Sequence, residues 1–399
     1  MILRKAFRYR LYPTPAQEAS LAVQFGHARF VYNHFLQVRQ DYYTAHRNDP
    51  GKKGLSYEDT SKLLTALKKT PECEWLRQAD SQVLQESLRN LERAYQAFFA
   101  GRSGYPHFKQ KSQPQSIHYP QRFRPGERSV HAPKVGEIRA VVHRPLEGKP
   151  KNLTISKTAS GKYYASIQCE LELPEPALKA GAVGIDLGLS AFATLSSGEK
   201  LDNPRTLAKS QEKLARLQCR LARKVKGSHG REKARLRLAR AHERVANQRR
   251  DFLHKLSHDL VCRFGYIALE DLHVAGMVKN HALSGAIADA SWSEFTRMLS
   301  YKGQWVGTRV MQIGRFEPSS KTCHGCGHKL ERLPLEKREW DCPVCHRHHD
   351  RDENAAINIL NISRAGMARR NAGGEAGSPA ALSRRQASLK PEAQSFRIG

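Results

Sequence analysis

The 399-residue sequence has no apolar segment that approaches the roughly 20 residues needed to cross a bilayer. Its first residues, Met1-Ile-Leu-Arg-Lys5, lead into an alternating segment rather than into the continuous apolar stretch of a secretory signal. We therefore expect neither a membrane-spanning nor an exported protein, and we expect it to work in the cytoplasm.

Acidic residues are scarce. The chain has 38 Asp and Glu against 67 Lys and Arg, which gives a formal net charge of +29 with histidine neutral. Such an excess on a large chain is typically balanced by a polyanion, and nucleic acid is the first candidate. An anionic membrane surface is the alternative. Charge alone does not separate an enzyme that acts on nucleic acid from a protein that only binds it.

Cysteines are too unevenly placed for a disulfide framework. Four of the eight are scattered, and the others form two Cys-x2-Cys pairs 15 residues apart: Cys323, Cys326, Cys342 and Cys345. This spacing is typical of a zinc ribbon, in which four thiolates surround a structural Zn²⁺ and leave no position for water. We expect the nearby histidines, His349 among them, to face solvent or nucleic acid.

The first hundred residues combine a strand with a predicted helical domain. Residues 2–12 alternate apolar and basic side chains, as a strand does. Thr14, with Gln17 three residues later and Pro15 in the first turn, is typical of the start of a helix. Helical periodicity then continues, so we predict a helical domain over residues 14–100.

A β region is predicted after residue 101, where proline, glycine and aromatic residues become frequent. Residues 152–156 and 162–171 are predicted to form a hairpin. Because the strand over residues 2–12 has no neighbour of its own, we expect it to join this later region. Residues 1–13 and 101–178 would then form one β domain, interrupted by the helices.

The C-terminal half begins at a boundary marked by two prolines, Pro174 and Pro176. Apolar strands are predicted at residues 182–188, 191–195, 266–270 and 308–313. Between the second and third of these lies a long helical segment, which Lys226-Gly-Ser-His-Gly230 is predicted to break into two antiparallel helices. Over residues 364–399 we expect a disordered basic tail.

Basic residues are concentrated in that helical segment. Residues 205–255 contain 17 Lys and Arg against 4 Asp and Glu. This excess is too sustained for an ordinary solvated face, so we predict that it binds phosphate groups. We make the same prediction for Arg29, Arg39 and Arg47 of the first helix.

Aromatic and basic residues alternate in two segments of the β region, residues 105–109 and 119–124. Such side chains could stack on unpaired bases. They could equally pack into the core of the β domain, and the sequence leaves both readings open.

Three carboxylates lie at predicted strands or at a helix start. Asp186 lies in an apolar strand, Glu270 ends another, and Asp352 begins a predicted helix. Each alone is more often a turn or capping residue, but burying a carboxylate is costly unless it is paired or bound to metal. Together they could hold two Mg²⁺ or Mn²⁺ ions about 4 Å apart and hydrolyse a phosphodiester. Spacing leaves open whether Asp350 or Asp352 is the ligand.

These segments, in this order, resemble TnpB, the family of insertion-sequence (OrfB-type) RNA-guided nucleases related to compact type V CRISPR effectors. The resemblance extends to about residue 363. It is carried by Tyr9-Arg-Leu-Tyr-Pro-Thr-Pro15, Gly184-Ile-Asp-Leu-Gly188, Leu269-Glu-Asp-Leu272, Pro318-Ser-Ser-Lys-Thr-Cys323, the cysteine pairs and Asp350-Arg-Asp-Glu-Asn-Ala-Ala-Ile-Asn-Ile359.

The resemblance implies an α+β multidomain fold. It implies a RuvC nuclease domain of RNase H-like fold over residues 179–318 and 350–363, with a zinc-ribbon module inserted over residues 319–349. It also implies that the β domain is a barrel (wedge) domain interrupted by a helical recognition domain. Asp186, Glu270 and Asp352 would be catalytic and bind Mg²⁺ or Mn²⁺, and the four cysteines would bind Zn²⁺.

The resemblance also implies the partners, a transposon-derived noncoding guide RNA and target double-stranded DNA carrying a short transposon-adjacent motif. We therefore predict an RNA-guided DNA endonuclease, whose specificity comes from base pairing. One alternative is a DNA transposase that joins DNA ends with the same acids. Another is a nuclease-inactive, RNA-guided DNA-binding repressor, which the three intact acids disfavour.

Overall fold

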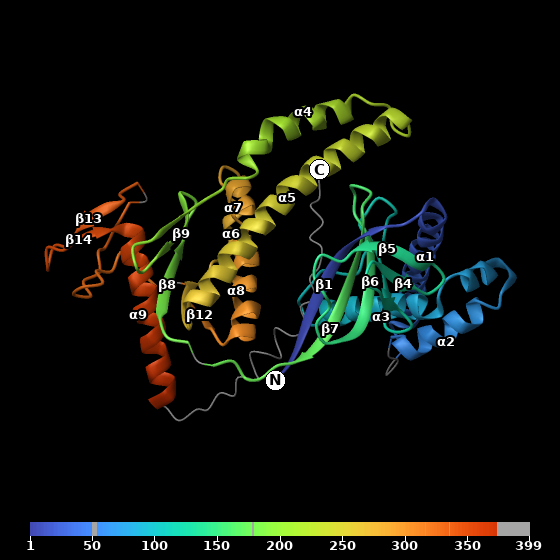
Figure 1. The fold of residues 1–399 in the computed structure, drawn as a ribbon, viewed down its shortest axis with the longest axis horizontal. Helices are drawn as coiled ribbons and strands as arrows, with labels where there is room; N and C mark the ends of the chain where they lie inside the picture. The colour runs from blue at the N-terminus through green and yellow to red at the C-terminus, as the bar shows by residue number, and fades with distance from the viewer. Residues whose placement is uncertain (50–53, 178, 316, 335, 373–399) are drawn as a thin grey trace. The chain divides into compact units, whose positions relative to one another are not determined.

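The computed structural model describes residues 1–49, 54–177, 179–315, 317–334 and 336–372. These residues divide into two compact units, with the division between Leu173 and Pro174. Figure 1 shows the helices and strands of both units. In the part of the chain that is described, no helix is both long enough and apolar enough to span a membrane.

An antiparallel sheet forms the core of the first unit. Its strands follow the order β2 (Gln115–Tyr119), β6 (Lys149–Lys157), β7 (Tyr163–Glu172), β1 (Ile2–Tyr12), β5 (Gly136–Val141), β4 (Ser129–Ala132) and β3 (Arg124–Pro125). β6 and β7 form the predicted hairpin. β1 pairs along most of its length with β7, so the prediction that the first strand joins the later β region is confirmed.

This sheet is open among the described residues, whereas a closed barrel was predicted. β2 at one edge pairs with β6, and β3 at the other edge pairs with β4. β3 consists of Arg124 and Pro125, and a proline offers no backbone N–H to a further strand. The short strand and its proline therefore limit further pairing at the β3 edge of the sheet.

A helical layer follows β1 in the sequence. It contains α1 (Pro15–His46), α2 (Tyr57–Leu67), the 3₁₀ helix η1 (Pro71–Gln78) and α3 (Ser81–Phe99). α1 begins with the predicted capping box of Thr14 and Gln17. Leu21 and Phe25 in its first half pack into the core of the sheet, whereas its second half packs with α2 and α3. One continuous helix thus joins the helical layer to the sheet.

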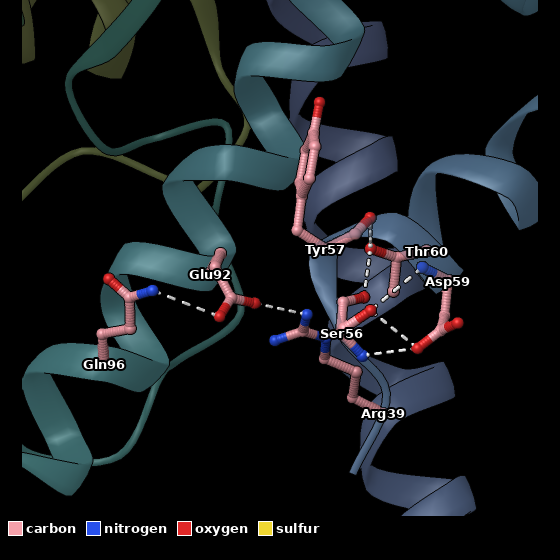
Figure 2. A network of polar contacts seen from close by, with 7 residues as sticks. All are labelled: Arg39, Ser56, Tyr57, Asp59, Thr60, Glu92 and Gln96. Atoms are coloured by element: carbon pink, nitrogen blue, oxygen red, sulfur yellow. Dashed lines mark hydrogen bonds and ion pairs between the residues drawn. The ribbon is translucent and has the colours of Figure 1, made fainter.

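Arg39 of α1 lies inside this helical layer. Its guanidinium donates a hydrogen bond to Glu92 Oε2 at 2.6 Å and lies 5.0 Å from the ring centre of Tyr95. Figure 2 shows Arg39 beside Glu92, near the capping box that Ser56 and Asp59 form at the start of α2. The prediction that Arg39 binds phosphate is wrong, because this arginine is buried and already paired with a carboxylate.

A mixed sheet forms the core of the second unit. Its order is β10 (Lys200–Asp202), β9 (Ala191–Leu195), β8 (Ala182–Leu187), β11 (Tyr266–Glu270) and β12 (Arg309–Ile313). β9 is antiparallel to both β10 and β8, whereas β11 runs parallel to β8 and to β12. The strands predicted in this half of the chain are therefore confirmed.

The helices of this unit include the predicted antiparallel pair. They are η2 (Ala208–Ser210), α4 (Gln211–Ala222), α5 (His229–Arg263), α6 (Val274–Met277), α7 (Ser284–Ala290), α8 (Trp292–Val306) and α9 (Arg351–Ala372). Leu214 of α4 and Leu238 of α5 meet in the apolar seam of the pair.

The disordered basic tail was predicted over residues 364–399, and this start is too early. α9 continues to Ala372, so residues 364–372 are helical. A helix that is already packed extends readily, because each further residue adds one hydrogen bond without a new nucleation cost. Residues 373–399 lie outside the described residues.

Alternation along β8 assigns the two faces of the second sheet to different helices. Val183 and Ile185 pack in a cluster with residues of α5 and α8. Gly184 faces α9, and a Cβ atom there would lie 2.0 Å from the backbone oxygen of Ala356. Figure 1 shows α9 on one side of β8 and α5 and α8 on the other. Glycine therefore allows the backbone of α9 to approach the strand.

We expect Gly184→Ala to lower the free energy of unfolding by about 1–3 kcal/mol, because the added methyl group overlaps the backbone of α9. Chemical denaturation of the full chain measures the change. Gly285→Ala in α7 is the control, since a Cβ atom there meets nothing within 4 Å. If the two variants unfold with equal free energies, the close packing of α9 on β8 is contradicted.

Candidate metal centres

Three carboxylates are brought together at the α9 side of the second sheet. β8 and β11 are parallel neighbours with Ile185 in register with Leu269, so the next residues, Asp186 and Glu270, project from the same face of adjacent strands. Asp352 lies in the first turn of α9, the helix that covers this face. The three predicted acids, which are far apart in the sequence, therefore surround one site.

The pKa of Asp186 reflects this arrangement. Burial, and then the negative charges of Glu270 and Asp352, raise the pKa of Asp186 to about 8. The nearby guanidinium groups of Arg351 and Arg338 act in the opposite direction. Carboxylate oxygens are the ligands that Mg²⁺ and Mn²⁺ prefer, and a cation would relieve the repulsion among these acids. The donor set therefore fits a divalent metal ion.

Asp350 and Asp352 have different surroundings. The Asp350 carboxylate accepts hydrogen bonds from the backbone N–H groups of Asp352 and Glu353, both at 3.0 Å, and from Lys200 Nζ at 2.6 Å. Burial acts to raise the pKa of Asp350, but these contacts hold it below its usual value. Asp350 thus caps α9, whereas Asp352 interacts with Asp186, which favours Asp352 as the ligand.

A cavity of about 270 Å³ opens beside Glu270, and Ser319, Lys321 and Arg351 line part of it. Ser319 Oγ donates a hydrogen bond to Glu270 Oε1. Ser319 belongs to none of the predicted metal-binding sets, although this residue lies in one of the segments that carry the family resemblance. A serine hydroxyl has no spacing pattern that would have revealed its partner.

The four cysteines of the predicted zinc ribbon come together, with all their Sγ atoms within 4.8 Å of one another. The two Cys-x2-Cys pairs form equivalent turns. The backbone N–H of Gly327 donates to the carbonyl of Cys323, and that of His346 donates to the carbonyl of Cys342, both at 2.9 Å. Gly327 and His346 both have a positive φ. This cluster fits a structural Zn²⁺. Among the described residues, these cysteines are the one group of three or more possible metal ligands whose donor atoms lie within 4.8 Å of one another. The carboxylate oxygens of Asp186, Glu270 and Asp352 are therefore farther apart than the four Sγ atoms.

His349 is buried beside this cluster. It lies in β14 (His348–Asp350), which pairs with β13 (Glu339–Asp341). Its side chain is 2% exposed, and its Nε2 lies 3.0 Å from Cys323 Sγ. The expectation that it faces solvent or nucleic acid is wrong, because strand alternation turns His349 inward and His348 outward. An imidazole N–H in this position would orient the thiolate.

The predicted basic surface is present on α4 and α5. Exposed side chains of Lys209 in η2, Lys213 in α4 and Arg244 in α5 line a cavity of about 450 Å³ beside these helices. The positive charge of these side chains favours phosphate groups, so phosphate binding by this surface stays a prediction.

The two aromatic segments differ in burial. Tyr119 is fully buried in the first sheet and Phe123 packs against the same core, so the segment over residues 119–124 is structural. Tyr105 and Phe108 are 38% and 45% exposed. Base stacking therefore stays a prediction for the segment over residues 105–109.

Three family models match the chain. They are described as "Probable transposase" (OrfB_IS605, residues 166–281), "Cas12f1-like, TNB domain" (residues 292–359) and "Helix-turn-helix domain" (HTH_OrfB_IS605, residues 1–48). The last region is not a helix-turn-helix in this chain, since it forms β1 and the single helix α1. The matches define a protein of a transposon-associated class.

Two relatives match nearly the whole chain. "Putative RNA-guided DNA endonuclease" of Streptomyces pristinaespiralis is 41% identical over 92% of this chain and 91% of its own length. "Putative RNA-guided DNA endonuclease InsQ" of Escherichia coli (strain K12) is 35% identical over 91% of this chain and 93% of its own. The chain therefore belongs to the TnpB-like family that these proteins represent.

A solved Cas12f1–sgRNA–target DNA complex is a weaker match. Its protein chain is 12% identical with a TM-score of 0.48, covering 90% of this chain and 99% of that chain. A likeness at this level assigns neither function nor partner.

We expect binding of Mg²⁺ at the acids to release about one proton at pH 7, because Asp186 with a pKa of about 8 is then mostly protonated and the metal ion displaces that proton. The apparent affinity should therefore rise with pH up to about 8 and level off above it. Calorimetry in two buffers of different ionisation enthalpy measures the release, which Asp186→Asn should abolish. An affinity independent of pH would contradict the shifted pKa.

We expect the purified chain to contain about one Zn²⁺ per molecule and Cys342→Ser to lose it, because three thiolates leave the tetrahedral shell incomplete. Elemental analysis by mass spectrometry measures the content. Cys219→Ser, which changes an exposed cysteine of α4, is the control and should keep the metal. Zinc retained by Cys342→Ser would rule out the four-cysteine site.

Proposed function

We propose that this chain is an RNA-guided DNA endonuclease whose nuclease centre is the site of Asp186, Glu270 and Asp352. The observation that carries the proposal is the convergence of these acids in a chain of the TnpB-like family. Within the proposal, the second unit is an RNase H-like (RuvC) nuclease domain with a zinc-ribbon module, and the first unit is the wedge and recognition region.

The three acids would hold Mg²⁺ or Mn²⁺ and so are the catalytic residues of the proposal. A bound pair of such ions lowers the pKa of a coordinated water and stabilises the leaving oxygen of a phosphodiester. The chain itself supplies the placement of the acids. Lys200 pairs with Asp350 at the start of α9, and Ser319 donates a hydrogen bond to Glu270.

Positive charge beside the acids favours the approach of a phosphodiester. Arg338 NH1 lies 3.4 Å from Asp352 Oδ1, and Arg351 is close enough to Asp186 to lower its pKa. A nucleic-acid backbone would otherwise be repelled by three carboxylates. The exposed lysines and arginines of α4 and α5 extend this attraction over a larger surface.

The proposed partners are a transposon-derived noncoding guide RNA and a target double-stranded DNA. The net charge of +29 supports simultaneous binding of two polyanions. Base pairing with the guide would select the target, while the protein reads a short adjacent motif on the DNA. The proposal assigns Cys323, Cys326, Cys342 and Cys345 to a structural Zn²⁺, which takes no part in the chemistry.

We expect the chain with its guide RNA and Mg²⁺ to cut double-stranded DNA that carries the matching target, and Asp186→Ala to reduce the rate by at least about 10²-fold, because a metal ligand is lost. Gel analysis of the products measures the rate. Asp251→Asn, which changes an exposed carboxylate on α5, is the control and should cut normally.

The same assay separates the alternatives. Cutting without RNA would exclude the guided mechanism, and cutting by Asp186→Ala would exclude the assigned site. A transposase would transfer the strands of transposon ends with the protein alone. A repressor would bind the target tightly without metal-dependent cutting.

A further inference from the structure

Residues 318–323, which we call the strap, connect the acid site to the zinc module. Ser319 near its start is 3% exposed, and the Ser319 hydroxyl donates a hydrogen bond to Glu270 Oε1. Cys323 at its end is one of the four clustered cysteines. One short segment thus contacts a candidate ligand of Mg²⁺ and supplies a candidate ligand of Zn²⁺.

Two asparagines of α9 hold the strap in place. Asn358 Nδ2 donates hydrogen bonds to the carbonyl oxygens of Ser319 and Thr322, at 2.8 and 2.6 Å. Asn354 Nδ2 donates to the carbonyl of Thr322 at 2.8 Å, while its Oδ1 accepts from the backbone N–H of His324 at 3.0 Å. The two side chains are 1% and 6% exposed for Asn354 and Asn358. Buried amides without partners are costly, so these contacts determine where the strap lies on the helix.

The same helix carries the third acid. Asp352 lies two residues before Asn354, so the asparagines that hold the strap also set its position relative to Asp352. Through Ser319 the strap also contacts the Glu270 carboxylate. A hydroxyl that donates to one carboxylate oxygen restricts the side chain and leaves the other oxygen for a metal ion.

The second cysteine pair is connected to the acids by a separate route. Cys342, the first cysteine of this pair, follows β13 directly. Glu339 of β13 pairs with Asp350 of β14, and Asp350 caps α9. The backbone N–H of Arg351 donates to the carbonyl of Arg338 at 2.8 Å. Both halves of the cysteine cluster are therefore attached to the first turns of α9, where Asp352 lies.

We propose that Ser319 is a positioning residue for Glu270, and that the strap couples Zn²⁺ binding by the cysteines to divalent-metal binding by the acids. The proposal rests on the proposed function in one respect, that the acids bind a divalent metal. It goes further in assigning Ser319, Asn354 and Asn358 a role in that binding, and in making the zinc module a support of the acid site.

The test of Ser319 measures Mn²⁺ affinity of the zinc-loaded full chain without nucleic acid, by electron paramagnetic resonance of free Mn²⁺. Ser319→Ala should weaken binding about tenfold, the effect typical of losing a hydrogen-bond partner of a metal ligand. Ser319→Thr keeps the hydroxyl and should bind within about threefold of wild type. Ser320→Ala, which removes the neighbouring hydroxyl, is the control. Equal affinities of Ser319→Ala and Ser320→Ala would overturn the assignment.

The test of coupling repeats the titration after Zn²⁺ has been removed by Cys326→Ser. The affinity for Mn²⁺ should fall by at least as much as in Ser319→Ala, because the end of the strap is released. In the Ser319→Ala background, Cys326→Ser should weaken Mn²⁺ binding by much less than it does in the wild-type background. The reason is that Ser319→Ala has already removed the contact between the strap and Glu270. An unchanged affinity in Cys326→Ser, or fully additive effects, would overturn the coupling.

A third variant separates this inference from the proposed function. Asp186→Asn removes an acid without touching the strap. If it binds Mn²⁺ as the wild type does, the acids are not the metal site and both proposals fail. If Asp186→Asn loses binding while Ser319→Ala keeps it, the inference about the strap alone fails. Circular dichroism and zinc content confirm that each Ser319 variant is folded, and Ser319→Thr remains informative if Ser319→Ala is not.

Discussion

The mutual repulsion of carboxylates that share one partly buried site is the constraint on which the second unit depends. Asp186 and Glu270 project from neighbouring parallel strands, and α9 brings Asp352 to the same face. Burial and the neighbouring negative charges raise the pKa of Asp186. A raised pKa means that the folded chain disfavours the charged form of this carboxylate. An arrangement of this kind is typical of sites that bind a cation or perform proton chemistry.

Several features of the fold serve to maintain that arrangement. Gly184 removes the side chain that would separate α9 from β8. Asp350 caps the helix and is held by Lys200, so one carboxylate of the segment is kept for structure. Two buried asparagines attach the helix to the strap of residues 318–323. The surroundings are basic, which suits a phosphodiester and reduces the repulsion among the acids.

Local sequence patterns predicted the longer elements because their causes are local. The capping box of α1, the strands β1, β6 and β7 of the first sheet, four strands of the second sheet and the break between α4 and α5 depend on residues that are close in the sequence. The short strands β2 to β5 and β10 were not predicted. The predictions for Arg39 and His349 are wrong for the opposite reason. A buried arginine paired with Glu92, and a histidine beside Cys323, have partners that no periodicity reveals. The closure of the first sheet likewise depends on which edge strands can pair.

The residue types of the site could be read from the sequence alone: two spaced cysteine pairs, acids at strand and helix ends, and a large excess of basic charge. Their order along the chain also carried the family resemblance. Only the tertiary structure decided that Asp352 joins the other acids, and that Ser319 contacts Glu270. The cap of Asp350 is itself a local contact with the backbone of Asp352 and Glu353. The convergence of the three acids depends on the register of β11 against β8 and on the close approach of α9. Both join segments that lie more than 80 residues apart, where local spacing carries no information.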